Sequence, residues 1–133
     1  MLDVLLTALS APLLAMTSSA CAAPAIAGAV AHELGTNGDL NTYDVAITVK
    51  NMGATEPSSM LQSVQVFQDA TKVDQKGTPP LRAGASATVH YRLQRSSEAR
   101  PGSTHLRFSL VMHDPHRPVA DCSGANATYR INV

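Results

Sequence analysis

Apolar and polar side chains alternate along this chain in short runs divided by turn residues, and this alternation constrains the fold more than any other feature. The clearest run follows Gly84, whose lack of a side chain suits a tight turn. One face of the run is apolar, with Ala87, Val89, Tyr91 and Leu93, and the other is polar, with Thr88, His90, Arg92 and Gln94. A period of two residues is that of a β-strand with one buried face. We therefore predict a half-buried strand here.

The same pattern recurs at intervals of roughly ten residues, the spacing of strands in a β-sandwich. Strands are expected at residues 25–34, 43–50, 63–68, 71–75, 87–94, 104–113 and 128–133. Residues 71–75 are polar enough for an exposed sheet edge. No 3.6-residue period follows residue 22, so the sequence predicts an all-β chain, a seven-stranded immunoglobulin-like β-sandwich preceded by an N-terminal hydrophobic signal segment.

Turn residues mark where these strands should end. Residues 35–41 are rich in Gly, Asn and Asp and are expected to form a hairpin loop. Asn51 and Gly53 both tolerate a positive φ, and on that ground they are expected to end the strand at residues 43–50. Asp69 begins a further predicted turn.

Size and charge limit the classes of partner. The 133 residues allow one domain, and removal of an export signal would leave about 110, close to the roughly 100 of an immunoglobulin-like sandwich. With 10 basic and 10 acidic residues, no net field attracts nucleic acid or an anionic membrane. Aromatic residues make up only 4%, which leaves few rings for stacking a sugar. No nucleic-acid partner is expected.

Residues 1–22 are largely apolar and end in small residues, as secretory signal peptides do. We expect export to the periplasm or the extracellular space, with residues 23–133 forming the immunoglobulin-like domain. Asp3 stands where a signal usually has Lys or Arg, and an uncleaved hydrophobic anchor is the alternative. A membrane is expected to be contacted only through such an anchor or through a lipid.

Cys21 lies at this boundary and has three possible fates. It could become the lipid-modified first residue of a bacterial lipoprotein, although Ser18 stands where such signals usually have Leu. Cleavage after Ala22 would remove it. Cleavage after Ala20 would let it pair with Cys122, closing a loop of about 100 residues that stabilises the domain by about 3–5 kcal/mol in the chain-entropy model.

Three segments in order resemble the bacterial cell-adhesion-related domain family, CARDB, whose members are immunoglobulin-like modules of seven strands. They are YDVAITVKNMG at residues 43–53, LRAGASATVHYRL at residues 81–93 and LVMHDPHRPVADCSGAN at residues 110–126. The resemblance covers about residues 25–133. It implies a spacer, adhesion unit or stabilising domain of an exported protein. The family's closing loop usually has an acidic residue followed by paired Asn, whereas here Cys122 intrudes between Asp121 and Asn126.

Oxygen donors in the last long loop make calcium the best ion candidate. They are Asp114, Asp121 and Asn126, and Ca²⁺ takes six to eight such ligands, some from backbone carbonyls. Asp and Asn also cap turns, which is the alternative interpretation.

A transition-metal site is not expected, because three or four donors must converge for one. His113 and His116 form the densest pair, but the strand with His90 should lie in the other sheet, with its imidazole pointing away. Catalysis is not expected either. The chain has no Gly-x-Ser-x-Gly motif, and no base is placed beside a Ser or Cys except in the single loop that holds Asp114, His116 and Cys122.

These observations predict a non-catalytic, exported β-sandwich module that binds a protein or cell-surface partner, as adhesion modules do. The contact would be made through the loops at residues 51–60 and 114–126, or by strand addition at a sheet edge. The alternative is a structural spacer or envelope-assembly subunit, lipid-anchored at Cys21.

Overall fold

The computed structural model describes residues 21–116 and 128–133, which contain seven β-strands. They are β1 (Pro24–Asn37), β2 (Leu40–Asn51), β3 (Leu61–Gln68), β4 (Thr71–Thr78), β5 (Ser86–Ser96), β6 (His105–His113) and β7 (Thr128–Asn132). The predicted all-β class and the number of strands are confirmed. In the part of the chain that is described, no helix is long and apolar enough to cross a membrane. Most of the predicted export signal lies outside the described residues, and so does Cys122.

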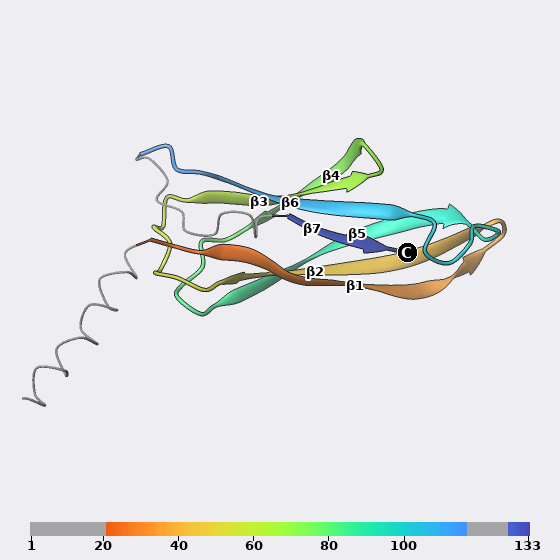
Figure 1. Ribbon diagram of the computed structural model, residues 1–133, viewed down its shortest axis with the longest axis horizontal. Helices are drawn as coiled ribbons and strands as arrows, with labels where there is room; N and C mark the ends of the chain where they lie inside the picture. The colour runs from red at the N-terminus through yellow and green to blue at the C-terminus, as the bar shows by residue number, and fades with distance from the viewer. Residues whose placement is uncertain (1–20, 117–127) are drawn as a thin grey trace, which may run out of the picture.

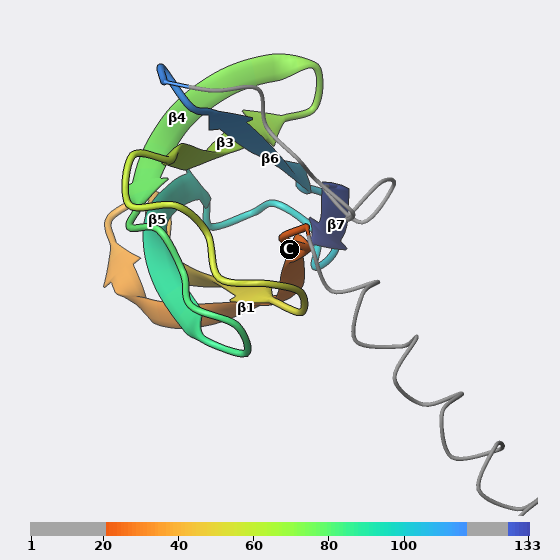
Figure 2. The same cartoon turned by 90° about the vertical axis from the view of Figure 1, so that its left-hand side faces the viewer.

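Two antiparallel sheets pack face to face. One has the strand order β1-β2-β5, and the other has the order β4-β3-β6-β7. Figure 1 shows the two layers from the side, and Figure 2 shows them facing each other when viewed along the strands. β4 forms an edge of the four-stranded sheet, as the polar sequence of residues 71–75 predicted. The chain is therefore a β-sandwich.

The core lies between the sheets and is built from the inward halves of the alternating runs. Its buried apolar members are Ile26, Val45, Ile47, Val49, Val64, Val66, Leu81, Leu93, Leu106, Phe108, Leu110 and Val133. Phe108 is the only aromatic side chain in that buried set and is fully buried, so the centre is filled mainly by branched aliphatic residues. Such side chains suit the pleated, half-buried surface of a strand.

The hairpin between β1 and β2 is tighter than expected. The predicted loop at residues 35–41 was wrong in extent, because β1 runs to Asn37 and β2 begins at Leu40, which leaves only two residues in the turn. Gly38 takes a φ of 62° there, a conformation that glycine adopts without steric cost. The Thr36 hydroxyl donates to Asn41 Oδ1 at 2.7 Å. These polar side chains, which suggested a loop, therefore link the solvent-exposed ends of the two strands.

The reason expected for the end of β2 was wrong. Asp69 is the only non-glycine residue with a positive φ in the described part of the chain, and neither Asn51 nor Gly53 has one. Asn51 is fully buried, and its amide side chain joins several backbone segments. At Gly53, a Cβ atom would lie 2.5 Å from the carbonyl oxygen of Cys21. Close approach of two backbones, not a left-handed turn, therefore requires glycine there.

Candidate functional site

The loops after β2 and after β6 meet at one end of the sandwich. The Ser59 hydroxyl donates to both carboxylate oxygens of Asp114, at 2.9 and 3.0 Å. The backbone N–H of His116 donates to Asp114 Oδ1 at 2.9 Å, so it is the amide of His116 and not its ring that makes this contact. The structure thus brings together the described parts of the two loops predicted to bind a partner.

These contacts give Asp114 a structural role in addition to any ionic one. Its carboxylate is buried, with only 5% of the residue exposed. The other two predicted calcium ligands, Asp121 and Asn126, lie outside the described residues, and so does residue 122, the predicted disulfide partner of Cys21. Within residues 21–116 and 128–133, no three His, Cys, Asp or Glu side chains are grouped to hold a metal ion. The calcium site and the disulfide stay predictions.

The histidines diverge as expected. His90 is on β5 in the three-stranded sheet, and its Nδ1 lies 3.0 Å from Asp44 Oδ2 on the neighbouring strand β2. His105 and His113 are on β6 in the other sheet, where both are exposed. The two groups of imidazoles therefore face away from each other across the core.

An apolar hollow of about 560 Å³ lies where the loops meet the outer face of the four-stranded sheet. Its lining includes Ser58, Met60, Leu61, Pro80, Val111 and His113. On the sheet, Ser63 stands opposite Gly77 on β4 and opposite Val111 on β6. Because glycine has no side chain and serine has a small one, the sheet surface is recessed at this point.

The walls of this hollow expose apolar side chains to solvent. Leu61 is 59% exposed and Val111 is 39% exposed, although both are on strands whose inward residues form the core. Beneath them, Gln62 is buried and its Nε2 donates to Thr78 Oγ1 at 2.8 Å. This buried hydrogen bond joins β3 to β4 beneath the hollow.

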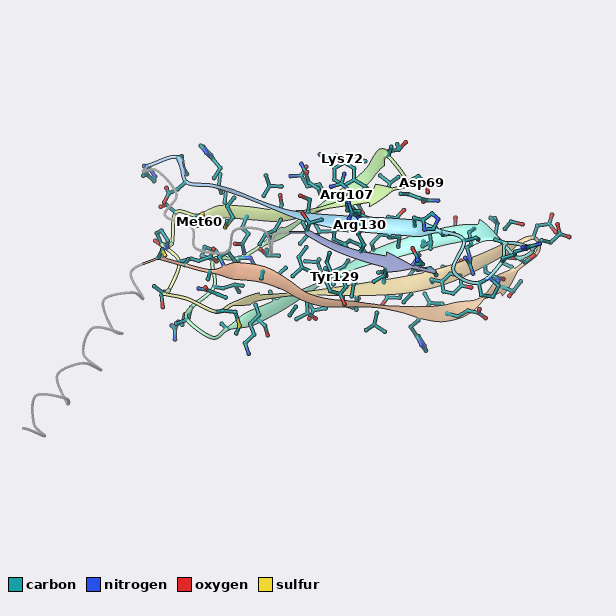
Figure 3. The ribbon with its side chains drawn as sticks, viewed as in Figure 1. Met60, Asp69, Lys72, Arg107, Tyr129 and Arg130 are labelled. Atoms are coloured by element: carbon teal, nitrogen blue, oxygen red, sulfur yellow. The ribbon has the colours of Figure 1, made fainter. Side chains whose placement is uncertain are left out.

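Cationic side chains form a row across the same face, further from the loops. Phe67 on β3 stands opposite Lys72 on β4 and opposite Arg107 on β6, and Arg107 stands opposite Arg130 on β7. We call Lys72, Phe67, Arg107 and Arg130 the cationic row. Figure 3 shows its three charged members one above another, with Asp69 beside them at the β3–β4 turn.

Arg107 is held in place by the ring of Phe67. The centre of its guanidinium lies 4.0 Å from the ring centroid, within the range of a cation–π contact. Beside it is a smaller hollow of about 320 Å³, lined by Asp69, His105, Leu106, Arg107, Arg130 and Asn132. The row could not be predicted from the sequence, because its members are spread from residue 67 to residue 130.

Comparison with known proteins supports the fold. No protein-family model and no curated protein matches the chain. Among solved structures, the chain is similar to the crystal structure of the CARDB domain of the PF1109 protein from Pyrococcus furiosus in complex with di-metal ions. The TM-score is 0.55 at 14% sequence identity, and the match covers 84% of this chain and 89% of that domain. The solution NMR structure of the same domain matches at 16% identity with a TM-score of 0.44, covering 84% of this chain and 94% of that one.

The match to the crystal structure supports the assignment of the chain as a β-sandwich. Its fold is that of CARDB-domain structures, which confirms the resemblance predicted from the three sequence segments. At 14% identity, the similarity to the crystal structure concerns the fold alone.

Proposed function

We propose that this chain is a non-catalytic, immunoglobulin-like module that is exported and binds a protein or cell-surface partner. The observation that supports this function is the apolar hollow, where Leu61 and Val111 remain exposed on the outer face of the four-stranded sheet. Exposed apolar side chains rimmed by polar groups are typical of surfaces that contact proteins. Arginine, which is enriched at protein interfaces, lies on the same face.

The proposed location follows from residues 1–22, whose apolar sequence suits an export signal. The module would act in the periplasm or outside the cell, either free or anchored to the envelope. Calcium binding by Asp114 with Asp121 and Asn126 is a separate proposal. Equilibrium dialysis of the purified domain against calcium chloride tests it, and absence of retained calcium would rule it out.

Site-specific photo-crosslinking in the native host tests the proposed function. A photoreactive amino acid would replace Leu61 in the hollow, and the control would carry it at Thr88, an exposed position on the opposite sheet. If the proposal is correct, the Leu61 position gives one discrete crosslinked product and the Thr88 position does not. The Leu61 product is also expected to disappear when Val111→Lys is introduced. Equal products from both positions, or none from either, would contradict it.

Light scattering during size-exclusion chromatography separates this function from the structural alternative. A binding module is expected to run as a monomer when purified. A spacer or envelope-assembly subunit is expected to form ordered oligomers, and its crosslinked product from Leu61 would be a second copy of the same chain.

A further inference from the structure

We propose that the cationic row binds acidic side chains of the partner, so that the partner contacts this module with an acidic and partly apolar protein segment. This inference rests on the proposed function and names the chemistry of the partner. Three features of the four-stranded sheet support it: the positive charge on its outer face, the lack of Asp or Glu among the outward residues of its described strands, and the apolar hollow beside the row.

The outer face of the four-stranded sheet carries charge of one sign, although the whole chain is neutral. The outward side chains of the described strands β3, β4, β6 and β7 include Lys72, Arg107 and Arg130 and no Asp or Glu. Asp74 on β4 faces the other side, where Val66 stands opposite it and Lys76 pairs with it at 3.4 Å. Asp69, in the turn between β3 and β4, lines the smaller hollow together with Arg107 and Arg130.

This arrangement costs the folded state free energy, because like charges directly opposite each other on neighbouring strands repel. Arg107 and Arg130 form such a pair, and no ion pair joins either of them to a carboxylate within residues 21–116 and 128–133. A bound anion would remove the repulsion. The pair therefore gains more from an acidic ligand than an isolated surface arginine would.

Stacking on Phe67 prepares Arg107 for this role. A guanidinium whose central carbon lies 4.0 Å from a ring centroid can still donate two parallel hydrogen bonds to a carboxylate through the N–H groups at its edge. Adjacent strands are about 4.8 Å apart, so the row spans about 14 Å from Lys72 to Arg130. That length accommodates more than one acidic side chain.

The apolar hollow on the same face favours a protein segment over other polyanions. An acidic polysaccharide has carboxylates for the row but no apolar group for Leu61 and Val111. An anionic membrane is disfavoured by charge, because surface attraction typically needs a cluster of about four to eight basic residues. A segment with Glu or Asp and one large apolar residue complements both features.

Fluorescence anisotropy tests the inference with defined probes. The first probe is a labelled twelve-residue peptide of Glu residues with one central Leu. Oligogalacturonate of equal charge and vesicles containing phosphatidylserine serve as competitors. The peptide is expected to bind the purified domain, to bind more weakly as salt is raised, and to be displaced poorly by either competitor.

Variants identify the surface. Arg130→Glu, at an exposed position, and the double variant Arg107→Glu/Arg130→Glu are expected to weaken peptide binding by about tenfold or more. The single variant Arg107→Lys, which keeps the charge, should bind the peptide more tightly than the single variant Arg107→Glu. The matched control is Arg92→Glu, which reverses an exposed charge on β5 in the other sheet and should leave binding unchanged. Circular dichroism confirms that each variant is folded.

Equal binding by the wild type and the double variant would overturn the inference, as would tighter binding of oligogalacturonate or vesicles than of the peptide. The proposed function is tested separately, by photo-crosslinking from Leu61 in the host, so the two proposals can fail independently. A partner crosslinked at Leu61 combined with no peptide binding would overturn the acidic chemistry and leave the binding function in place.

Discussion

Asn51 Nδ2 donates a hydrogen bond to the carbonyl oxygen of Leu81 at 3.0 Å, in the interior of the sandwich end. This contact ties the last residue of β2 to the segment that leads into β5. The same amide nitrogen donates to the Ala54 carbonyl at 2.7 Å, and Oδ1 accepts from the N–H groups of Ala23 and Gly53, both at 3.0 Å. One side chain thus joins three separate parts of the backbone.

Removal of this side chain should be costly. Asn51→Ala leaves two N–H donors and two carbonyl acceptors without their partner, and each buried unpaired group costs about 1–3 kcal/mol. We expect the free energy of unfolding, measured with urea, to fall by about 3 kcal/mol or more. Asn37→Ala, at an exposed position at the end of β1, should change it by less than about 0.5 kcal/mol. Similar losses in both variants would contradict this role for Asn51.

Gly53 and Gly28 form a second matched pair. A Cβ atom at Gly53 would lie 2.5 Å from the Cys21 carbonyl oxygen and 2.7 Å from the Ala23 nitrogen, so Gly53→Ala must displace the segment directly before β1. Overpacking of this kind typically costs about 1–3 kcal/mol. Nothing lies within 4 Å of a Cβ atom at Gly28, so Gly28→Ala should be neutral or slightly stabilising. Thermal unfolding compares the two, and a stable Gly53→Ala variant would show that the two backbones can separate.

The stability of the domain should fall in alkaline solution through Tyr91. Burial raises the pKa of this phenol above its ordinary value of 10.0, and the nearby charge of Asp74 raises it further. The folded state therefore holds the proton more tightly than the unfolded state, so the contribution is complete below pH 10 and is lost as the pH rises through the folded-state pKa.

Urea unfolding of the wild type and Tyr91→Phe at a series of alkaline pH values measures this effect. The wild type should lose more stability than Tyr91→Phe over that range. Asp74→Asn should bring the pKa of Tyr91 closer to 10.0, which absorbance of the phenolate would detect. Parallel pH profiles for wild type and Tyr91→Phe would exclude the linkage.

The predicted Cys21–Cys122 disulfide can be tested by intact mass. Protein recovered from its host is expected to begin at Cys21, to be two hydrogens lighter than its reduced form, and to take up thiol reagent only after reduction. Reduction should lower the free energy of unfolding by about 3–5 kcal/mol. A mass increased by acyl chains at Cys21 would instead support a lipid anchor and the envelope-subunit alternative.

Strand positions and buried faces could be predicted because the two-residue period is a local property of the sequence. Val45, Ile47 and Val49 are all fully buried, as their alternation with polar neighbours indicated. The end of β2 was misjudged because Asn and Gly have more than one structural use. Asn51 is a buried hydrogen-bonding residue and Gly53 permits close backbone approach, and neither role leaves a local pattern.

The contact surface could be predicted only in part. Loops at residues 51–60 and 114–126 were placed at one end, and the Ser59–Asp114 contact confirms this for their described parts. The cationic row could not be predicted, since Lys72, Arg107 and Arg130 become neighbours only when the register of four strands is known. The net charge did not indicate the row either, because a net charge of zero does not show how charged residues are distributed between the two sheets.

The start of β1 and the end of the chain lie at opposite ends of the described sandwich, and this placement determines how the sandwich would respond to mechanical force. β1 begins where Pro24 stands opposite Asn51, whereas Val133 is hydrogen-bonded to Thr104 at the opposite end of the strands (Figure 1). Ladder hydrogen bonds run across the strands, so tension between these points would load the β1–β2 and β6–β7 bonds together in shear. Single-molecule stretching should show one abrupt rupture, and gradual yielding would contradict this. At tensions below that rupture, the ladder hydrogen bonds would transmit a pull along the strands with little extension.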